Sequence, residues 1–173
     1  MFNWPLLINR ALLTGLGLSL VLVAIMGISM ALAPDMWVGD YPPDIKQKYG
    51  PMSRRAARLR PYVAAPFFLA FFLIPILGLL ALRAKVGLVP FVPALVYAFV
   101  ALLVFNTFDL LILDWLLFCT IRPRMMVLPG TQGMAGYRNY RFHFVGFFKG
   151  LAFCAVGGLV IAALWLVLQW IIT

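Results

Sequence analysis

Two aspartates and one asparagine inside an apolar stretch are the residues of this chain best suited to chemistry. Asn106, Asp109 and Asp114 lie in an apolar run from Phe91 to Phe118, and the whole chain has only five acidic residues. Placing a carboxylate in lipid costs several kcal/mol, so such residues face protein or water and often mark function. We therefore take the three as a candidate intramembrane polar site.

Their spacing predicts different roles for the two aspartates. Asn106 precedes Asp109 by three residues, so both side chains share one helix face. Asp114 is five residues further on, about 140° around an α-helix, and we expect it to pair with Arg122 and Arg124 just outside the helix. No basic residue lies deep in any apolar run, which leaves two interpretations of Asp109: a structural hydrogen bond, or a proton- or cation-handling site.

A hypothesis for Asp109 follows from depth in the membrane. Counting inward from the same end of each apolar run places Phe71 and residues 157–158 at a similar depth to Asp109. Pro75 has no N–H to offer the carbonyl of Phe71, four residues earlier. We therefore expect Asp109, as a protonated carboxyl, to donate to the region of Phe71 directly or through water, supported by Asn106.

Basic residues define a second group of candidates. Arginine suits phosphate because its planar fork binds two oxygens at once. These positions predict contacts to anionic phospholipid head groups, or to the phosphate of a lipid substrate: Arg54, Arg55, Arg58, Arg60, Arg122, Arg124, Arg138, Arg141 and His143, the only histidine.

The elements that position these residues follow from composition. The chain is 65% hydrophobic and 11% charged, with a mean hydropathy of +1.03, whereas a soluble domain carries about 25% charge. We expect one all-α domain, residues 1–173, with four transmembrane helices at approximately 11–33, 61–82, 91–118 and 145–172. The first run exceeds the ~7–15 apolar residues of a signal peptide, so we expect it to be retained.

Charge predicts the orientation of these helices. Eleven of the fourteen Lys and Arg residues lie in the loops around 34–60 and 122–149, and the other three are Arg10, Arg83 and Lys85. Loops rich in Lys and Arg remain in the cytoplasm. Both long loops are then cytoplasmic and both termini outside, which fits a bacterial inner membrane. The net charge of +9 is explained in this way, without nucleic acid as a partner.

Small residues four apart predict how the helices pack. A stripe of them follows the last span: Gly146, Gly150, Cys154, Gly158 and Ala162. Small residues let helix backbones approach closely in membranes. The stripe faces helices of this chain, a second copy or another membrane protein; a glycine-lined channel is the alternative. Cys154 and the other cysteine, Cys119, are expected to be small packing residues, with no metal or cofactor.

Three functions remain open from the sequence. The first is an interaction or accessory membrane protein that acts through the small-residue stripe and the basic loops. The second is a small proton- or cation-linked transporter or channel, which a cavity reaching Asp109 would favour. The third is an enzyme acting on a lipid phosphate, which a cytoplasmic pocket gathering Asp114, His143 and the loop arginines would favour. No hydrolase, zinc-protease or phosphate-loop motif occurs in the sequence, so enzymatic activity remains uncertain.

Overall fold

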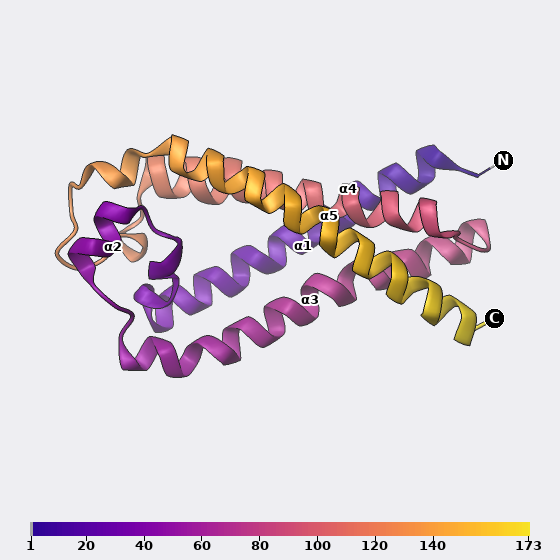
Figure 1. Cartoon of the computed structure of the whole chain (residues 1–173), viewed down its shortest axis with the longest axis horizontal. Coiled ribbons are helices and arrows are strands. Elements are labelled where there is room, and N and C mark those ends of the chain that lie inside the picture. Colours follow the sequence, from indigo (N-terminus) through magenta and orange to yellow (C-terminus); the bar gives the residue numbers. More distant parts are fainter. Residues whose placement is uncertain (1) are drawn as a thin grey trace.

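The computed structural model describes residues 2–173, so Met1, the first residue of the expected domain, lies outside them. Four long helices run alongside one another: α1 (Trp4–Leu32), α3 (Arg54–Val86), α4 (Phe91–Phe108) continued by η2 (Asp109–Ile121), and α5 (Tyr140–Ile171) (Figure 1). Each of the four is long and apolar enough to cross a membrane. No strand occurs in residues 2–173. The chain is therefore an all-α membrane protein, as its composition predicts.

Polar caps extend three of the helices beyond the expected spans. α1, α3 and α5 begin five to seven residues earlier than hydropathy predicts. In each case a side chain just before the helix accepts a hydrogen bond from a backbone N–H of the first turn, which satisfies a donor that the helix itself leaves free. The capping residues are Asn3, Ser53 and Asn139. The helices therefore begin before the expected spans, which followed the apolar runs alone.

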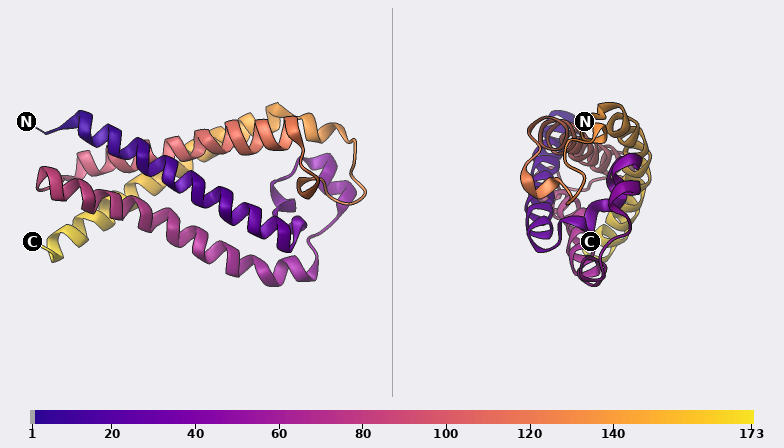
Figure 2. Two further views of the ribbon diagram at one scale, coloured as in Figure 1. Left: turned by 180° about the vertical axis from the view of Figure 1, so that it is seen from behind. Right: turned by 90° about the vertical axis from the view of Figure 1, so that its left-hand side faces the viewer.

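α4 lies at the centre of the bundle, with α1 and α5 packed against it and α3 packed against α1. Both termini lie at one end and both long loops at the other (Figure 1). We call the half of the bundle nearer the termini the terminal half and the other the loop half. α3 diverges from α5 toward the loop half, as seen from the front (Figure 1) and from behind (left view of Figure 2).

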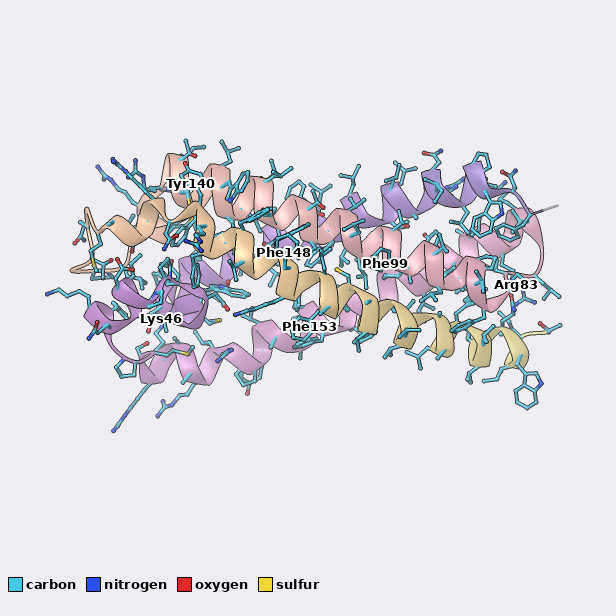
Figure 3. All side chains as sticks on the ribbon, turned by 45° about the horizontal axis from the view of Figure 1, so that its top comes forward. Lys46, Arg83, Phe99, Tyr140, Phe148 and Phe153 are labelled. Carbon is cyan, nitrogen blue, oxygen red and sulfur yellow. The ribbon has the colours of Figure 1, made fainter. Side chains whose placement is uncertain are left out.

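The terminal half holds the main hydrophobic core, in which polar groups are paired. The hydroxyls of Thr14 and Tyr97 lie 2.5 Å apart and join α1 to α4. Trp165 donates from Nε1 to the carbonyl of Val89 at 3.0 Å, and the Val89 N–H donates to Gln169 at 2.9 Å. At the same end, Arg83 donates to Thr173 Oγ1 at 3.1 Å (Figure 3). The largest fully buried side chains of this core include Trp165, Tyr97, Leu7, Leu18, Leu79 and Leu82.

The two long loops dock on each other and cover the loop end. The first carries η1 (Pro34–Asp40) and α2 (Pro43–Tyr49), and the second carries η3 (Arg124–Met126) and η4 (Ala135–Arg138). The Tyr41 hydroxyl donates to the carbonyl of Met126 at 2.9 Å. The backbone N–H of Gly136 donates to the Asp44 carboxylate, also at 2.9 Å. These contacts join the two loops to each other.

Candidate functional site

The backbone changes from α-type to π-type hydrogen bonding at Asp109. η2 is a π-helix over Asp109–Ile121 and ends where the Arg122 N–H donates to the Leu117 carbonyl at 2.7 Å. Hydrogen bonds in a π-helix join residues five apart, so side chains five apart lie about one turn apart on nearly one face. Asp109 and Asp114 are therefore less widely separated around the helix axis than an α-helix would make them. Their surroundings still differ, because Asp114 pairs with His143 and Asp109 does not.

A cavity of about 690 Å³ lies between α3 and α5 in the loop half; we call it the α3/α5 cavity. Its walls are mostly apolar and include six phenylalanines. Phe68 and Phe153 line it while remaining 58% and 74% exposed, so it opens on the surface that faces lipid. Phe153 lies midway along the bundle (Figure 3). The apolar wall includes Phe67, Phe68, Phe71, Phe72, Phe105, Phe153, Val156 and Val160.

One end of the α3/α5 cavity is polar. Trp37, Asp40 and Arg60 line it on the side of the docked loops, and Asn106 and Asp109 line it from α4 and η2. Partial removal of Asp40 from water raises the pKa of its carboxyl, and the positive charges of Arg60 and Lys46 lower that pKa in part. The cavity thus has a charged end beneath the loops and an apolar body along the helices.

Asn106 is fixed by its contacts with α5. Its Nδ2 donates to the carbonyl of Phe147 at 3.1 Å, and its side chain is 9% exposed. Gly150 makes room for this amide, because a Cβ at Gly150 would collide with Asn106 Oδ1. With Nδ2 committed to Phe147, Oδ1 is the free acceptor, and no donor of residues 2–173 reaches it.

Asp109 lines the α3/α5 cavity without a hydrogen bond to any described residue. The hypothesis that it donates to the carbonyl of Phe71 is not supported by a direct contact. The residues expected at that depth nevertheless lie near one another. The ring of Phe71 packs against Phe105, one turn from Asp109, with centroids 6.1 Å apart, and would contact a Cβ at Gly157. Asp109 and Phe71 thus line the same cavity.

Asp114 pairs with histidine instead of arginine. His143 Nδ1 lies 2.8 Å from the Asp114 carboxylate, and the His143 side chain is 5% exposed. The expected partners Arg122 and Arg124 lie beyond the end of η2, where Arg122 adopts a left-handed conformation with φ +53°. The early start of α5 at Tyr140 brings His143 within reach. His143 Nε2 is buried without a partner.

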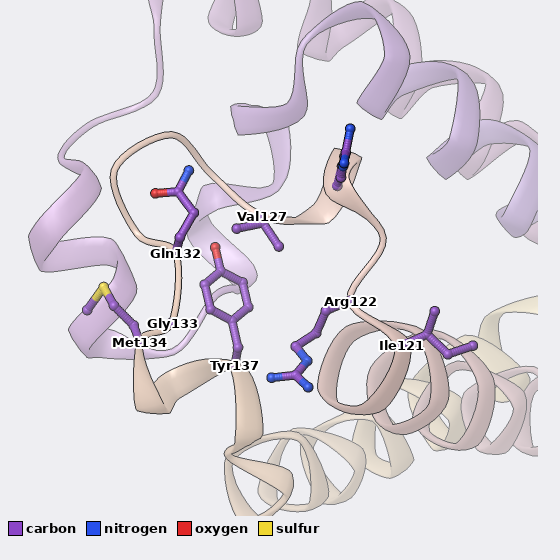
Figure 4. A pocket seen from close by; sticks show the side chains of 8 residues that line it. Ile121, Arg122, Val127, Gln132, Gly133, Met134 and Tyr137 are labelled. Carbon is purple, nitrogen blue, oxygen red and sulfur yellow. The ribbon is translucent and has the colours of Figure 1, made fainter.

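The loop arginines are not gathered around Asp114 and His143. Arg122 and Arg124 line a separate hollow of about 640 Å³ on the second loop, where Arg122 lies to one side of Tyr137 and Gln132 to the other (Figure 4). Neither Asp114 nor His143 lines that hollow. The remaining arginines of the two loops are exposed: Arg54, Arg55, Arg58, Arg60, Arg138 and Arg141. The residues named for a lipid-phosphate enzyme therefore lie in separate places.

The small-residue stripe of α5 mostly packs within this chain. Besides Gly150 beside Asn106, Cys154 donates from Sγ to the carbonyl of Leu102 at 3.3 Å, and Gly158 lies against the backbone of Phe99. Ala162 is also buried. Gly146, the first residue of the stripe, has nothing within 4 Å of where a Cβ would lie. Gly150, Cys154 and Gly158 therefore bring α5 close to α4.

The described part of the chain has no cluster of side chains suited to metal binding. No group of three or more His, Cys, Asp or Glu side chains there could hold a metal ion. The chemistry available is that of a cavity with free oxygen acceptors and aromatic walls. No family model, no curated protein and no solved structure matches this chain.

Proposed function

We propose that this protein binds an amphipathic molecule from the bilayer in the α3/α5 cavity. The single observation that carries this proposal is the shape and lining of the cavity. It has an apolar body open toward lipid and a polar end beneath the docked loops. A volume of about 690 Å³ lies within the range of small-molecule sites, roughly 300–1,000 Å³.

The divergence of α3 from α5 supports lateral entry. Phe68 on α3 and Phe153 on α5 line the cavity and are exposed, so a hydrocarbon chain reaches the cavity without crossing the loops. The polar head of the same molecule would lie among Asp109, Asn106 and Arg60. A protein of this kind acts as an accessory component that presents or holds the molecule for other membrane proteins.

The proposal also includes the orientation of the helix bundle in the membrane. We place the loop end in the cytoplasm and the termini outside, in a bacterial inner membrane, because eleven of the fourteen basic residues lie at the loop end. The exposed arginines at the start of α3 and α5 would then contact anionic phospholipid head groups. The α3/α5 cavity would open to the cytoplasmic leaflet.

A small proton- or cation-linked transporter is the second candidate, because the cavity reaches both Asn106 and Asp109. The terminal half is filled by the core around Tyr97 and Trp165, both of which are fully buried. Transport would therefore need a second conformation that opens that core. Binding needs only the conformation described here, and for this reason we place binding first.

A cavity-filling variant tests the binding proposal. Ala64 lines the cavity, whereas its neighbour Ala65 is exposed and does not. The purified protein in neutral detergent is mixed with equal amounts of phosphatidylethanolamine and phosphatidylglycerol, and bound lipid is measured by native mass spectrometry. Wild type and Ala65→Trp should retain one phospholipid per chain, and Ala64→Trp should lose it. Equal retention by both variants would contradict the proposal.

A further inference from the structure

We infer that the head group held at the polar end of the α3/α5 cavity is a primary ammonium, which donates hydrogen bonds to the Asp109 carboxylate and to Asn106 Oδ1. This inference rests on the proposed binding of an amphipathic molecule and specifies its chemistry. It follows from which polar atoms line the cavity and which of them have partners.

The inner polar atoms of the cavity are acceptors that lack donors. Within residues 2–173, Asp109 makes no hydrogen bond, and Asn106 uses only Nδ2, to the carbonyl of Phe147. Asn106 is more than nine-tenths buried and lines the cavity. Both residues line the cavity, and neither has an oxygen among the fully buried unpaired atoms, so a ligand in the cavity can reach these acceptors. A ligand that brings several N–H donors would satisfy both residues together.

Charge favours a cation over a neutral donor. Asp109 and Asp40 line the cavity against a single guanidinium, that of Arg60. The polar end therefore carries an excess of one negative charge when both carboxyls are ionised. An ammonium has three donors and no acceptor, so it matches both the charge and the hydrogen-bonding pattern. A sulfate or carboxylate head would place its oxygens against those of Asp109.

Two natural sources carry this head group on a hydrocarbon tail. One is a single-chain amine, and the other is an aminophospholipid such as phosphatidylethanolamine. In the second case Arg60, which lines the polar end on α3, is placed to bind the phosphate. Both sources share the ammonium at Asp109, and Arg60 distinguishes them.

Four probes with one tail and different heads test the inference. They are tetradecylamine, tetradecyltrimethylammonium, tetradecyl maltoside and tetradecyl sulfate, each added to the protein in neutral detergent and measured by native mass spectrometry. We expect tetradecylamine to bind about tenfold more tightly than the other three, because only its head is charged and carries N–H donors. Equal binding of tetradecylamine and tetradecyltrimethylammonium would contradict the inference that the head group donates hydrogen bonds to Asp109 and Asn106.

Asp109→Asn provides the residue-level test, with Asp44→Asn as the matched control. Both variants remove one negative charge. Asp44 lies on α2 outside the cavity, and asparagine keeps an oxygen for the Gly136 N–H there. Asp109→Asn should lower tetradecylamine binding about tenfold, because a charge-assisted hydrogen bond is lost. Binding of tetradecyl maltoside should not change, because its head group is uncharged. Asp44→Asn should change neither. Equal loss in both variants would contradict the role of Asp109.

The variants Ala64→Trp and Arg60→Gln distinguish failure of the head-group inference from failure of the proposed binding. If Ala64→Trp blocks all four probes but the amine is not preferred, the head-group inference fails and the proposed binding stands. If Ala64→Trp leaves every probe bound, the proposed binding itself fails. Arg60→Gln should weaken phosphatidylethanolamine and spare tetradecylamine if the natural source is a phospholipid, and spare both if it is a single-chain amine.

Discussion

The two halves of the bundle differ in how their buried polar groups are treated. In the terminal half, Thr14 pairs with Tyr97, and Trp165 donates to Val89. In the loop half, His143 Nε2 and Trp115 Nε1 are buried without partners, and these are the only two such side-chain atoms among the described residues. Unpaired buried polar atoms are costly. We infer that the terminal half is built for stability, whereas the loop half tolerates two unpaired atoms, neither of which lines the α3/α5 cavity.

Packing differs between the halves in the same direction. α1, α3, α4 and α5 all contribute to the terminal core, whereas α3 leaves α5 in the loop half and the α3/α5 cavity lies between them. The consequence is that substitutions in the terminal half should mainly lower stability. Substitutions that line the cavity should mainly alter ligand binding.

Substitution of Trp165 should have the largest effect on the free energy of unfolding. Trp165→Ala removes a fully buried ring and the hydrogen bond to Val89, so it should lower the free energy of unfolding by ~3 kcal/mol or more. Trp170→Ala is the control, because Trp170 lies on the same helix and is 82% exposed. Unfolding of both variants in mixed micelles is followed by circular dichroism. Similar stabilities would remove the distinction between the halves.

A glycine pair on α1 sharpens the comparison. A Cβ at Gly15 would lie 2.6 Å from Cβ of Val104 on α4, whereas Gly27 has nothing within 4 Å. Gly15→Val should therefore cost ~2 kcal/mol through overpacking, and Gly27→Val should cost little. Thermal unfolding in detergent compares the two. A larger loss at Gly27 would mean that α1 packs most closely in the loop half.

The Asp114–His143 pair should give the smallest of these effects. His143→Phe alone leaves Asp114 without its partner 2.8 Å away and should cost ~1 kcal/mol or more. Adding Asp114→Leu should restore most of that loss, because replacing both partners by apolar groups removes the unpaired charge. A double-mutant cycle of unfolding free energies measures the coupling. Additive effects would show that the pair contributes nothing as a pair.

The sequence predicts the four helices because long apolar runs have few alternatives in a membrane. It misplaces their starts, because Ser53 and Asn139 cap helices that include exposed basic residues. It does not predict the π-helix, since nothing in the spacing of Asp109 and Asp114 distinguishes α from π. The sequence also does not predict that the loops dock through Tyr41 and Met126, because these residues are far apart in the chain.

The candidate site was predicted in part. Asn106 and Asp109 stand out as polar residues in an apolar run, and they line the cavity. Trp37 and Asp40 were missed, because they reach the cavity only through the fold of the first loop. One signal was present: Phe67 and Phe71, four residues apart, place two aromatic rings on one face of α3. Their pairing with Phe105 depends on the course of α3.

Photolabelling tests the central claim most directly. Tetradecylamine with a diazirine at the end of its tail is irradiated with the protein in neutral detergent, and the labelled residues are mapped by peptide sequencing. The account predicts that label concentrates on the cavity residues Val156 and Val160, which lie on α5 beyond Gly150, and that it falls in Asp109→Asn. Label spread equally over the exposed face of α1, at Leu13, Leu20 and Ile28, would contradict it.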